Sequence, residues 1–230
     1  NGKSCDGISG LTYNNEGGKV EIIDHEYNET GFCGNCGASD PNFEPQIEYV
    51  LVNTPSELVS IASYATENPT VNIKITADLD MSEVSDQYVL ISGGYSGIFD
   101  GDGHTISNLV INNPDENYQG LIGVAGNCTI KNLTLDETCS VTGAEMCGGF
   151  VGTTSGQITI TMENLVMNGD VTASRNAAGI FGCNNFGQAT VYMTNCGVSG
   201  NIDGGYENGA MSGWSGNAAV TNCWFVGTIE

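Results

Sequence analysis

The chain of 230 residues is long enough for one substantial domain with a small additional segment. Its 27 acidic and 5 basic residues give a formal net charge of −22. This charge argues against nucleic-acid partners and anionic membrane surfaces, because both require clustered Lys and Arg. No run of about 18 apolar residues occurs, so we expect no membrane insertion. The 33 glycines favour tight turns over long helices.

Residues 1–45 contain a pattern typical of a structural zinc site. Cys33 and Cys36 form a CxxC motif in a glycine-rich turn, His25 precedes it by eight residues, and Cys5 is the candidate fourth ligand. Four thiolate or imidazole ligands make a closed tetrahedral zinc site. A segment this short has a small core, so a bound Zn²⁺ would stabilise it. The pattern also resembles the zinc-knuckle segments of secreted bacterial proteins. The alternative is a Cys33–Cys36 disulfide that leaves Cys5 unpaired.

Residues 46–70 are predicted to form a strand followed by a helix. The strand covers residues 46–52, and Thr54-Pro55-Ser56-Glu57 matches a capping box with proline at the first helical position. The apolar residues that follow have the spacing of one helix face, which ends near Pro69: Leu58, Ile61, Ala62 and Ala65. We expect this helix to cover the exposed first edge of the β-structure that follows it.

Residues 71–119 begin with two predicted strands, 71–75 and 88–91, and continue with an acidic glycine-rich segment. Asp100, Asp102 and His104 alternate with Gly101 and Gly103 in this segment. The glycines predict a tight turn in which Asp side chains accept hydrogen bonds from nearby amides. The alternative is a metal site formed by Asp100, Asp102 and His104.

Residues 120–230 contain an internal repeat of about 30 residues. Gly120-Leu121-Ile122-Gly123 recurs at 149–152, at 179–182 and, in altered form, at 209–212, in steps of 29, 30 and 30 residues. An asparagine followed by Leu or Cys is a second marker, and it also occurs once before the first repeat. These asparagines are Asn108, Asn132, Asn164, Asn195 and Asn222. Positions −2, +1 and +3 from each of them are apolar in every copy.

This periodicity predicts an all-β fold, a right-handed parallel β-helix of about five coils over residues 46–230. Alternating apolar residues mark strands with one buried face, and coils of a solenoid stack like residues upon like. The alternation breaks at each asparagine, which indicates a corner, because Asn tolerates the left-handed conformation. We therefore expect the five asparagines to form a structural ladder. Residues 46–70 would provide the first strand and the cap, 71–119 the first coils, and 120–230 the repeats.

The segment Phe-Asp-Gly-x-Gly-His-Thr-Ile at 99–106 and the Gly-Leu-hydrophobic-Gly repeats resemble the GLUG-motif family. These are bacterial secreted or surface proteins, and the resemblance covers residues 46–230. It implies a right-handed parallel β-helix, and the same motif accompanies surface adhesins and the non-catalytic parts of IgA-cleaving metallopeptidases. The last copy departs from the pattern at Ala210 and Ser212, and no C-terminal cap is recognisable. We expect either a longer natural protein or end-on self-association through the last coil.

The cysteines of the repeats are expected to be structural. Cys196 and Cys223 occupy a column otherwise filled by leucine, so they are predicted to be buried free thiols. Cys139 and Cys147 flank a polar stretch and are the one pair for which we weigh a disulfide.

The function expected from these features is that of a non-enzymatic, secreted or cell-surface module, adhesin-like or a rigid stalk. The alternative is a carbohydrate-active β-helix enzyme, a polysaccharide lyase or a glycosidase. Against it, residues 46–230 contain only Lys74, Lys131 and Arg175 as candidates for the Lys or Arg base that a lyase usually needs, and no pair of acids recurs in one column. Late aromatic residues outside the apolar columns suit a glycan or an extracellular protein partner: Tyr192, Trp214, Trp224 and Phe186.

Overall fold

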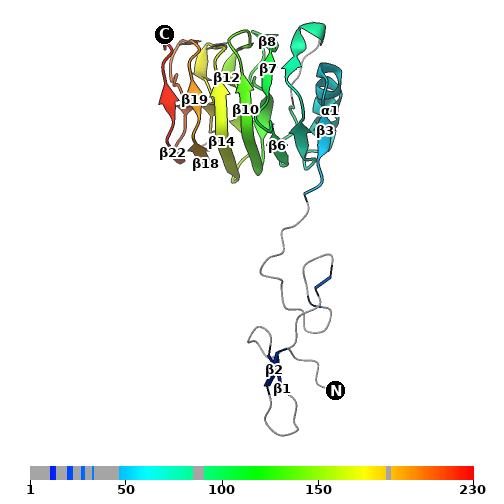
Figure 1. Cartoon of the computed structure of the whole chain (residues 1–230). Helices are drawn as coiled ribbons and strands as arrows, with labels where there is room; N and C mark the ends of the chain where they lie inside the picture. Colours follow the sequence, from blue (N-terminus) through cyan, green and yellow to red (C-terminus); the bar gives the residue numbers. More distant parts are fainter. Residues whose placement is uncertain are drawn as a thin grey trace. The chain divides into compact units, whose positions relative to one another are not determined.

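The computed structural model divides the chain into two units, Asn1–Glu48 and Tyr49–Glu230. It describes residues 11–13, 20–22, 27–28, 33, 47–84, 91–184 and 188–230. In the first unit, β1 (Leu11–Tyr13) pairs with β2 (Val20–Ile22) in an antiparallel sheet, and Tyr27 forms an antiparallel bridge with Cys33. The second unit is a parallel β-solenoid of about five turns with one short helix near its start, as the repeat predicts (Figure 1).

Helix α1 (Pro55–Glu67) covers the N-terminal end of the solenoid next to β3 (Val50–Val52). Thr54 accepts a hydrogen bond from the Glu57 amide, and the Glu57 side chain accepts one from the Thr54 amide, so the predicted capping box is present. The four apolar residues expected on one face are all buried in the solenoid core: Leu58, Ile61, Ala62 and Ala65. The helix thereby removes apolar core residues of the first coil from water.

The longest side of the solenoid is a sheet that runs across every coil. Its strands lie side by side in the order β3, β4 (Ile73–Ile75), β6 (Ile98–Asp100), β10 (Cys128–Leu135), β14 (Thr159–Met167), β18 (Thr190–Thr194) and β22 (Ala218–Thr221). Beyond the asparagine corner, the sheet is continued by the second halves of β10 and β14 and by four shorter strands. These are β5 (Leu79–Asp80), β7 (Thr105–Ser107), β19 (Gly197–Val198) and β23 (Trp224–Phe225). A 3₁₀ helix, η1 (Met81–Val84), follows β5.

Three further parallel sheets complete the coils. The second contains β8 (Val110–Asn113), β11 (Ser140–Gly143), β15 (Asp170–Ala173) and β20 (Ile202–Gly204). The third is the pair β12 (Glu145–Gly148) and β16 (Arg175–Ala178). The fourth contains β9 (Ile122–Ala125), β13 (Val151–Thr154), β17 (Phe181–Cys183) and β21 (Ser212–Trp214). Of the strand predicted at 88–91, Ile91 forms a bridge with Ile122, and the rest lies outside the described residues.

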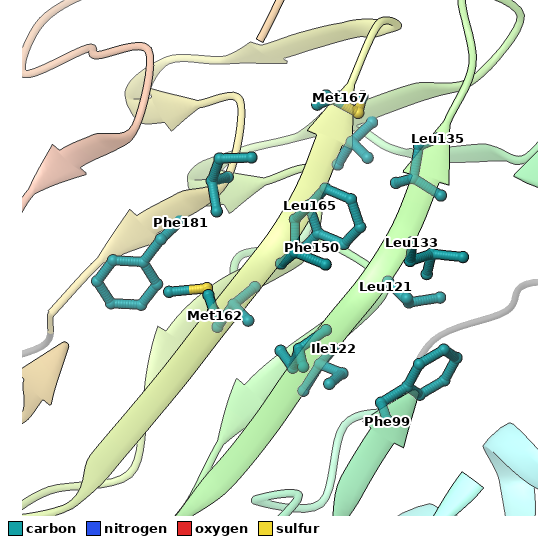
Figure 2. Packing of buried hydrophobic residues seen from close by; sticks show 14 of the residues in the cluster. Phe99, Leu121, Ile122, Leu133, Leu135, Phe150, Met162, Leu165, Met167 and Phe181 are labelled. Atoms are coloured by element: carbon teal, nitrogen blue, oxygen red, sulfur yellow. The ribbon is translucent and has the colours of Figure 1, made fainter. Parts of the chain in front are cut away.

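The core consists of columns, each a set of residues that stack in register on successive coils. Leu133 pairs with Leu165, and Val141 pairs with Val171. Figure 2 shows such residues pointing into the interior from β6, β10 and β14, with Phe150 and Phe181 filling the space between the sides. Burying one such Leu or Phe side chain stabilises the fold by about 1.5–3 kcal/mol.

The structure corrects the predicted alignment at both ends of the repeat. Asn108 is not the first member of the Asn132 column: Ile130 stacks on Phe99, and Ile106 stacks on Leu135. The turn at 101–104 adds residues to this coil, so Asn108 falls in a different corner, where its amide donates to Asp80 (2.8 Å). In the last coil Ser212 pairs with Phe181, so the final copy is 210–213, one residue later than predicted.

Gly213 thereby takes the position of Gly152 and Gly182. These glycines are required by close packing, because a Cβ at Gly152 would lie 2.6 Å from the backbone carbon of Tyr118. At Gly213 it would lie 2.8 Å from the backbone of Asn176. The one-residue shift therefore keeps a glycine at the position that packs against the backbone of the neighbouring corner residue.

The core-facing residues of the last coil are partly exposed. Val220, Phe225 and Ile229 continue the columns of Met193, Val198 and Ile202, and they retain 38–50% exposure.

Candidate functional site

The acidic turn after β6 is built around Asp100, a residue that is only 6% exposed. Its Oδ1 accepts hydrogen bonds from the Asp102 amide (2.9 Å) and from Asn132 Nδ2 (3.0 Å), and its Oδ2 lies 3.3 Å from Lys131 Nζ. Burial raises the pKa of Asp100, but these three donors more than offset it and the pKa lies below its ordinary value. The carboxylate is therefore ionised at neutral pH and holds the corner together.

The other two members of the predicted metal alternative contact different partners. Asp102 forms an ion pair with Lys74 (3.0 Å), and His104 Nδ1 lies 3.1 Å from Asp78 Oδ1. Asp102 and Gly103 have φ values of 51° and 86°, which is turn geometry. Within 47–84, 91–184 and 188–230, no three His, Cys, Asp or Glu side chains converge on one point as metal ligands would. Asp100, Asp102 and His104 each interact with partners within the protein, through hydrogen bonds or ion pairs.

The asparagine corner is a hydrogen-bonded ladder. Asn164 Nδ2 donates to Asn132 Oδ1 (2.8 Å), and Asn195 Nδ2 donates to Asn164 Oδ1 (3.1 Å). The bond from Asn132 to Asp100 anchors the ladder at its first coil. These three asparagines have φ values of 53–56°, and Asn222 in the last coil has 52°. The side-chain amides of Asn132, Asn164 and Asn195 are therefore hydrogen-bonded from one coil to the next, which is a structural role.

A second row of left-handed residues lies where β12 and β16 begin, and sequence reasoning missed it. Tyr118, Met146, Asn176 and Glu207 have φ values of 56–64°. Beside them Arg175 forms an ion pair with Glu145 (2.7 Å) and lies 5.6 Å from the ring centre of Tyr206. The varied residue types gave no repeating signal for this corner, whereas the asparagine corner repeats one residue type.

The predicted aromatic residues do not form a single face. Tyr192 and Trp224 lie on the long sheet, on opposite sides of the asparagine corner, and are 46% and 44% exposed. The indole of Trp224 covers Gly197. Trp214 lies on β21 in another sheet, and Phe186 lies outside the described residues. Tyr192 and Trp214 therefore lie in different sheets, because the chain turns several corners between them, and a ligand role for these aromatic residues stays a prediction.

The described solenoid cysteines are free thiols, and all of them are buried except Cys223, which was predicted to be buried and is partly exposed. Cys139 Sγ donates to the Ile106 carbonyl (3.2 Å) and Cys147 Sγ to the Glu145 carbonyl (3.6 Å), so this pair is not a disulfide. Burial raises the pKa of Cys128 and Cys139 to about 12, and that of Cys147 and Cys196 to about 11. Such thiols are poor nucleophiles and poor metal ligands.

Of the predicted zinc ligands only Cys33 lies among the described residues, where it is buried. Cys5, His25 and Cys36 lie outside them, so the zinc site stays a prediction. In the part of the chain that the structure describes, no helix has the length and apolarity needed to cross a bilayer.

Comparison with known proteins relates the chain to one sequence and one solved structure. No protein-family model matches it, so the GLUG resemblance stays a prediction. Over 89 residues, 38% of this chain, it is 38% identical to Halomucin from Haloquadratum walsbyi (strain DSM 16790 / HBSQ001), and the match spans 1% of Halomucin's length. The crystal structure of "a putative immunoglobulin A1 protease" from Bacteroides ovatus has a TM-score of 0.50 and 13% identity, with 80% of this chain and 84% of that chain covered. At this identity, the likeness shows that the two chains share the solenoid fold.

Proposed function

We propose that this chain is a non-enzymatic module of a secreted or cell-surface protein, and that it provides a rigid, adhesin-like surface. The observation that carries the proposal is the continuous register of its coils. Backbone ladders and core columns join successive coils, and the asparagine ladder also joins the coils of Asn132, Asn164 and Asn195. A stack joined in three ways resists bending, which suits a spacer or a display surface outside the cell.

The chemistry of the acidic groups supports a structural role over an enzymatic one. Asp100, the most buried described carboxylate, is held ionised by three donors, whereas a general acid of a glycosidase needs a raised pKa. Glu145 is paired with Arg175. The similarity to part of Halomucin supports use of such sequences as modules of larger proteins.

Two experiments test this proposal. In the first, the protein is incubated with neutral polysaccharides, with polygalacturonate and with immunoglobulin A1, and we expect no new reducing ends, unsaturated uronides or cleaved heavy chain. The non-enzymatic role would be refuted if the unmodified protein formed one of these products and a purified Asp100→Asn variant did not. In the second, intact cells of the source organism are treated with protease, and we expect the solenoid to be cleaved while a cytosolic marker survives.

The partners proposed for this module are a glycan or an extracellular protein at its side, and a second copy at its last coil. The half-exposed Val220, Phe225 and Ile229 support end-on association of two copies. Sedimentation of the protein and of a Val226→Asp variant tests it, because Val226 is 73% exposed on that coil. A monomer at all concentrations in the unmodified protein would refute the end-on contact.

A further inference from the structure

The outer face of the long sheet carries an open groove of about 300 Å³ across β6, β10 and β14. Its polar wall is formed by hydroxyl and amide side chains, and one aliphatic side chain completes it. The groups used below are Asn72, Ile98, Asn127, Thr129, Thr159 and Thr161. No residue that lines the groove carries a charge, although the chain has a net charge of −22.

The amide groups along the groove are held in fixed positions. Asn127 Oδ1 accepts a hydrogen bond from the Thr159 amide (2.8 Å), and Asn72 Oδ1 accepts one from the Ile98 amide (2.9 Å). Each bond fixes the plane of a side-chain amide relative to the sheet. The threonine side chains of β10 and β14 stand on a backbone that is paired on both edges. These polar groups are already ordered in the folded protein, so ligand binding would lose little side-chain conformational entropy.

The row of outward residues that crosses the groove includes an aromatic ring. Ile98, Thr129, Thr161 and Tyr192 are paired in register on four successive coils. The next residue in this row is Ala219, whose small side chain leaves Tyr192 uncovered on that side, and Tyr192 is 46% exposed. A tyrosine ring offers an apolar face for the C–H surface of a sugar and a hydroxyl group at its rim.

The neighbouring row is charged but balanced. Lys74, Asp100, Lys131 and Glu163 stack on successive coils, and Lys131 pairs with Asp100. Both lysines of the solenoid thus lie in this one row. The row beside the groove therefore has nearly equal numbers of positive and negative charges, so it provides no positive patch that would attract a polyanion.

We infer that the groove and the adjacent Tyr192 bind a neutral oligosaccharide that lies across the coils. The hydroxyl and amide groups match the hydrogen bonds of sugar hydroxyls, Ile98 and Tyr192 match the apolar faces of the rings, and the absence of charge in the groove fits an uncharged chain. This inference rests on the proposed surface role, for which it names the ligand class.

The test is titration calorimetry of the whole chain with cellohexaose, mannohexaose and N-acetylchitohexaose, and with oligogalacturonate as the charged comparison. We expect saturable binding of at least one neutral probe, with the same affinity at low and high salt. Tyr192→Ala and the double variant Thr129→Ala/Thr161→Ala should each weaken it about tenfold or more, the effect of losing one stacking contact or hydrogen bond. The matched control is Thr142→Ala/Thr172→Ala, an in-register pair on the second sheet, which should leave the affinity unchanged.

Three results would overturn the inference. These are no binding of any neutral probe, equal weakening by the control pair, and salt-dependent binding of oligogalacturonate alone. Circular dichroism of each variant shows whether a loss of binding reflects a loss of fold, and Tyr192→Phe keeps the ring if Tyr192→Ala does not fold. None of these results changes the cell-surface protease experiment, so failure of the glycan site and failure of the surface role are distinguishable.

Discussion

Replacement of Asn164 by alanine tests whether the asparagine ladder stabilises the solenoid. The side chain takes part in two hydrogen bonds, as donor to Asn132 (2.8 Å) and as acceptor from Asn195 (3.1 Å). Each is worth about 0.5–1.5 kcal/mol net, and alanine at a φ of 53° adds about 1–2 kcal/mol of backbone strain. We expect Asn164→Ala to lower the free energy of unfolding by about 2–5 kcal/mol, measured by urea denaturation followed with circular dichroism.

A glycine at the same position separates the two contributions. Asn164→Gly loses both hydrogen bonds but avoids the left-handed strain, at a cost of about 0.5–1 kcal/mol in chain entropy, so it should be the more stable of the two variants. Asn112→Ala, an exposed asparagine on β8 outside the ladder, is the control and should change stability by less than about 0.5 kcal/mol. A loss for Asn164→Ala no larger than that of the control would refute a stabilising ladder.

Four further changes have expected outcomes. Gly152→Ala places a Cβ within 2.6–2.8 Å of backbone atoms, so we expect little soluble protein in an expression assay, and a normal yield would contradict the packing. Asp100 has a lowered pKa in the folded state, so its contribution to stability is present above the ordinary pKa near 3.8 and is lost as pH falls through the folded value. Asp100→Asn should flatten the acid side of a stability–pH profile, and an unchanged profile counts against this. Iodoacetamide should label Cys223 first among the described solenoid thiols, because it alone of them is partly exposed, and mass spectrometry would show otherwise if a buried thiol reacted equally fast. Elemental analysis should find zinc in the intact protein and less in a Cys33→Ser/Cys36→Ser variant, and zinc-free folded protein would end that prediction.

The fold could be predicted because each coil repeats the same physical constraints. The columns through Leu133 and Val141 are visible in the sequence, since the repeated coils place an apolar residue at each of these positions. The capping box of α1 is equally local, because Thr54 and Glu57 lie three residues apart.

The alignment failed where coil length changes. Asn108-Leu109 looks like Asn132-Leu133, but the stacking partner of a residue depends on how many residues complete its coil. The same effect moved the last repeat by one residue. The groove beside Tyr192 could not be predicted either, because it combines residues from four coils that are adjacent only after the register is known.

In-register stacking also bears on how such a protein changes length during evolution. Because a coil contacts mainly the coils before and after it, duplication or deletion of one repeat leaves the other contacts intact and alters the span by a fixed step of about 4.8 Å. Insertions at the corners should be tolerated for the same reason, as the longer turn at 101–104 illustrates. The length of such a protein can thus change during evolution in steps of one coil, while the side chains on the outer faces change independently.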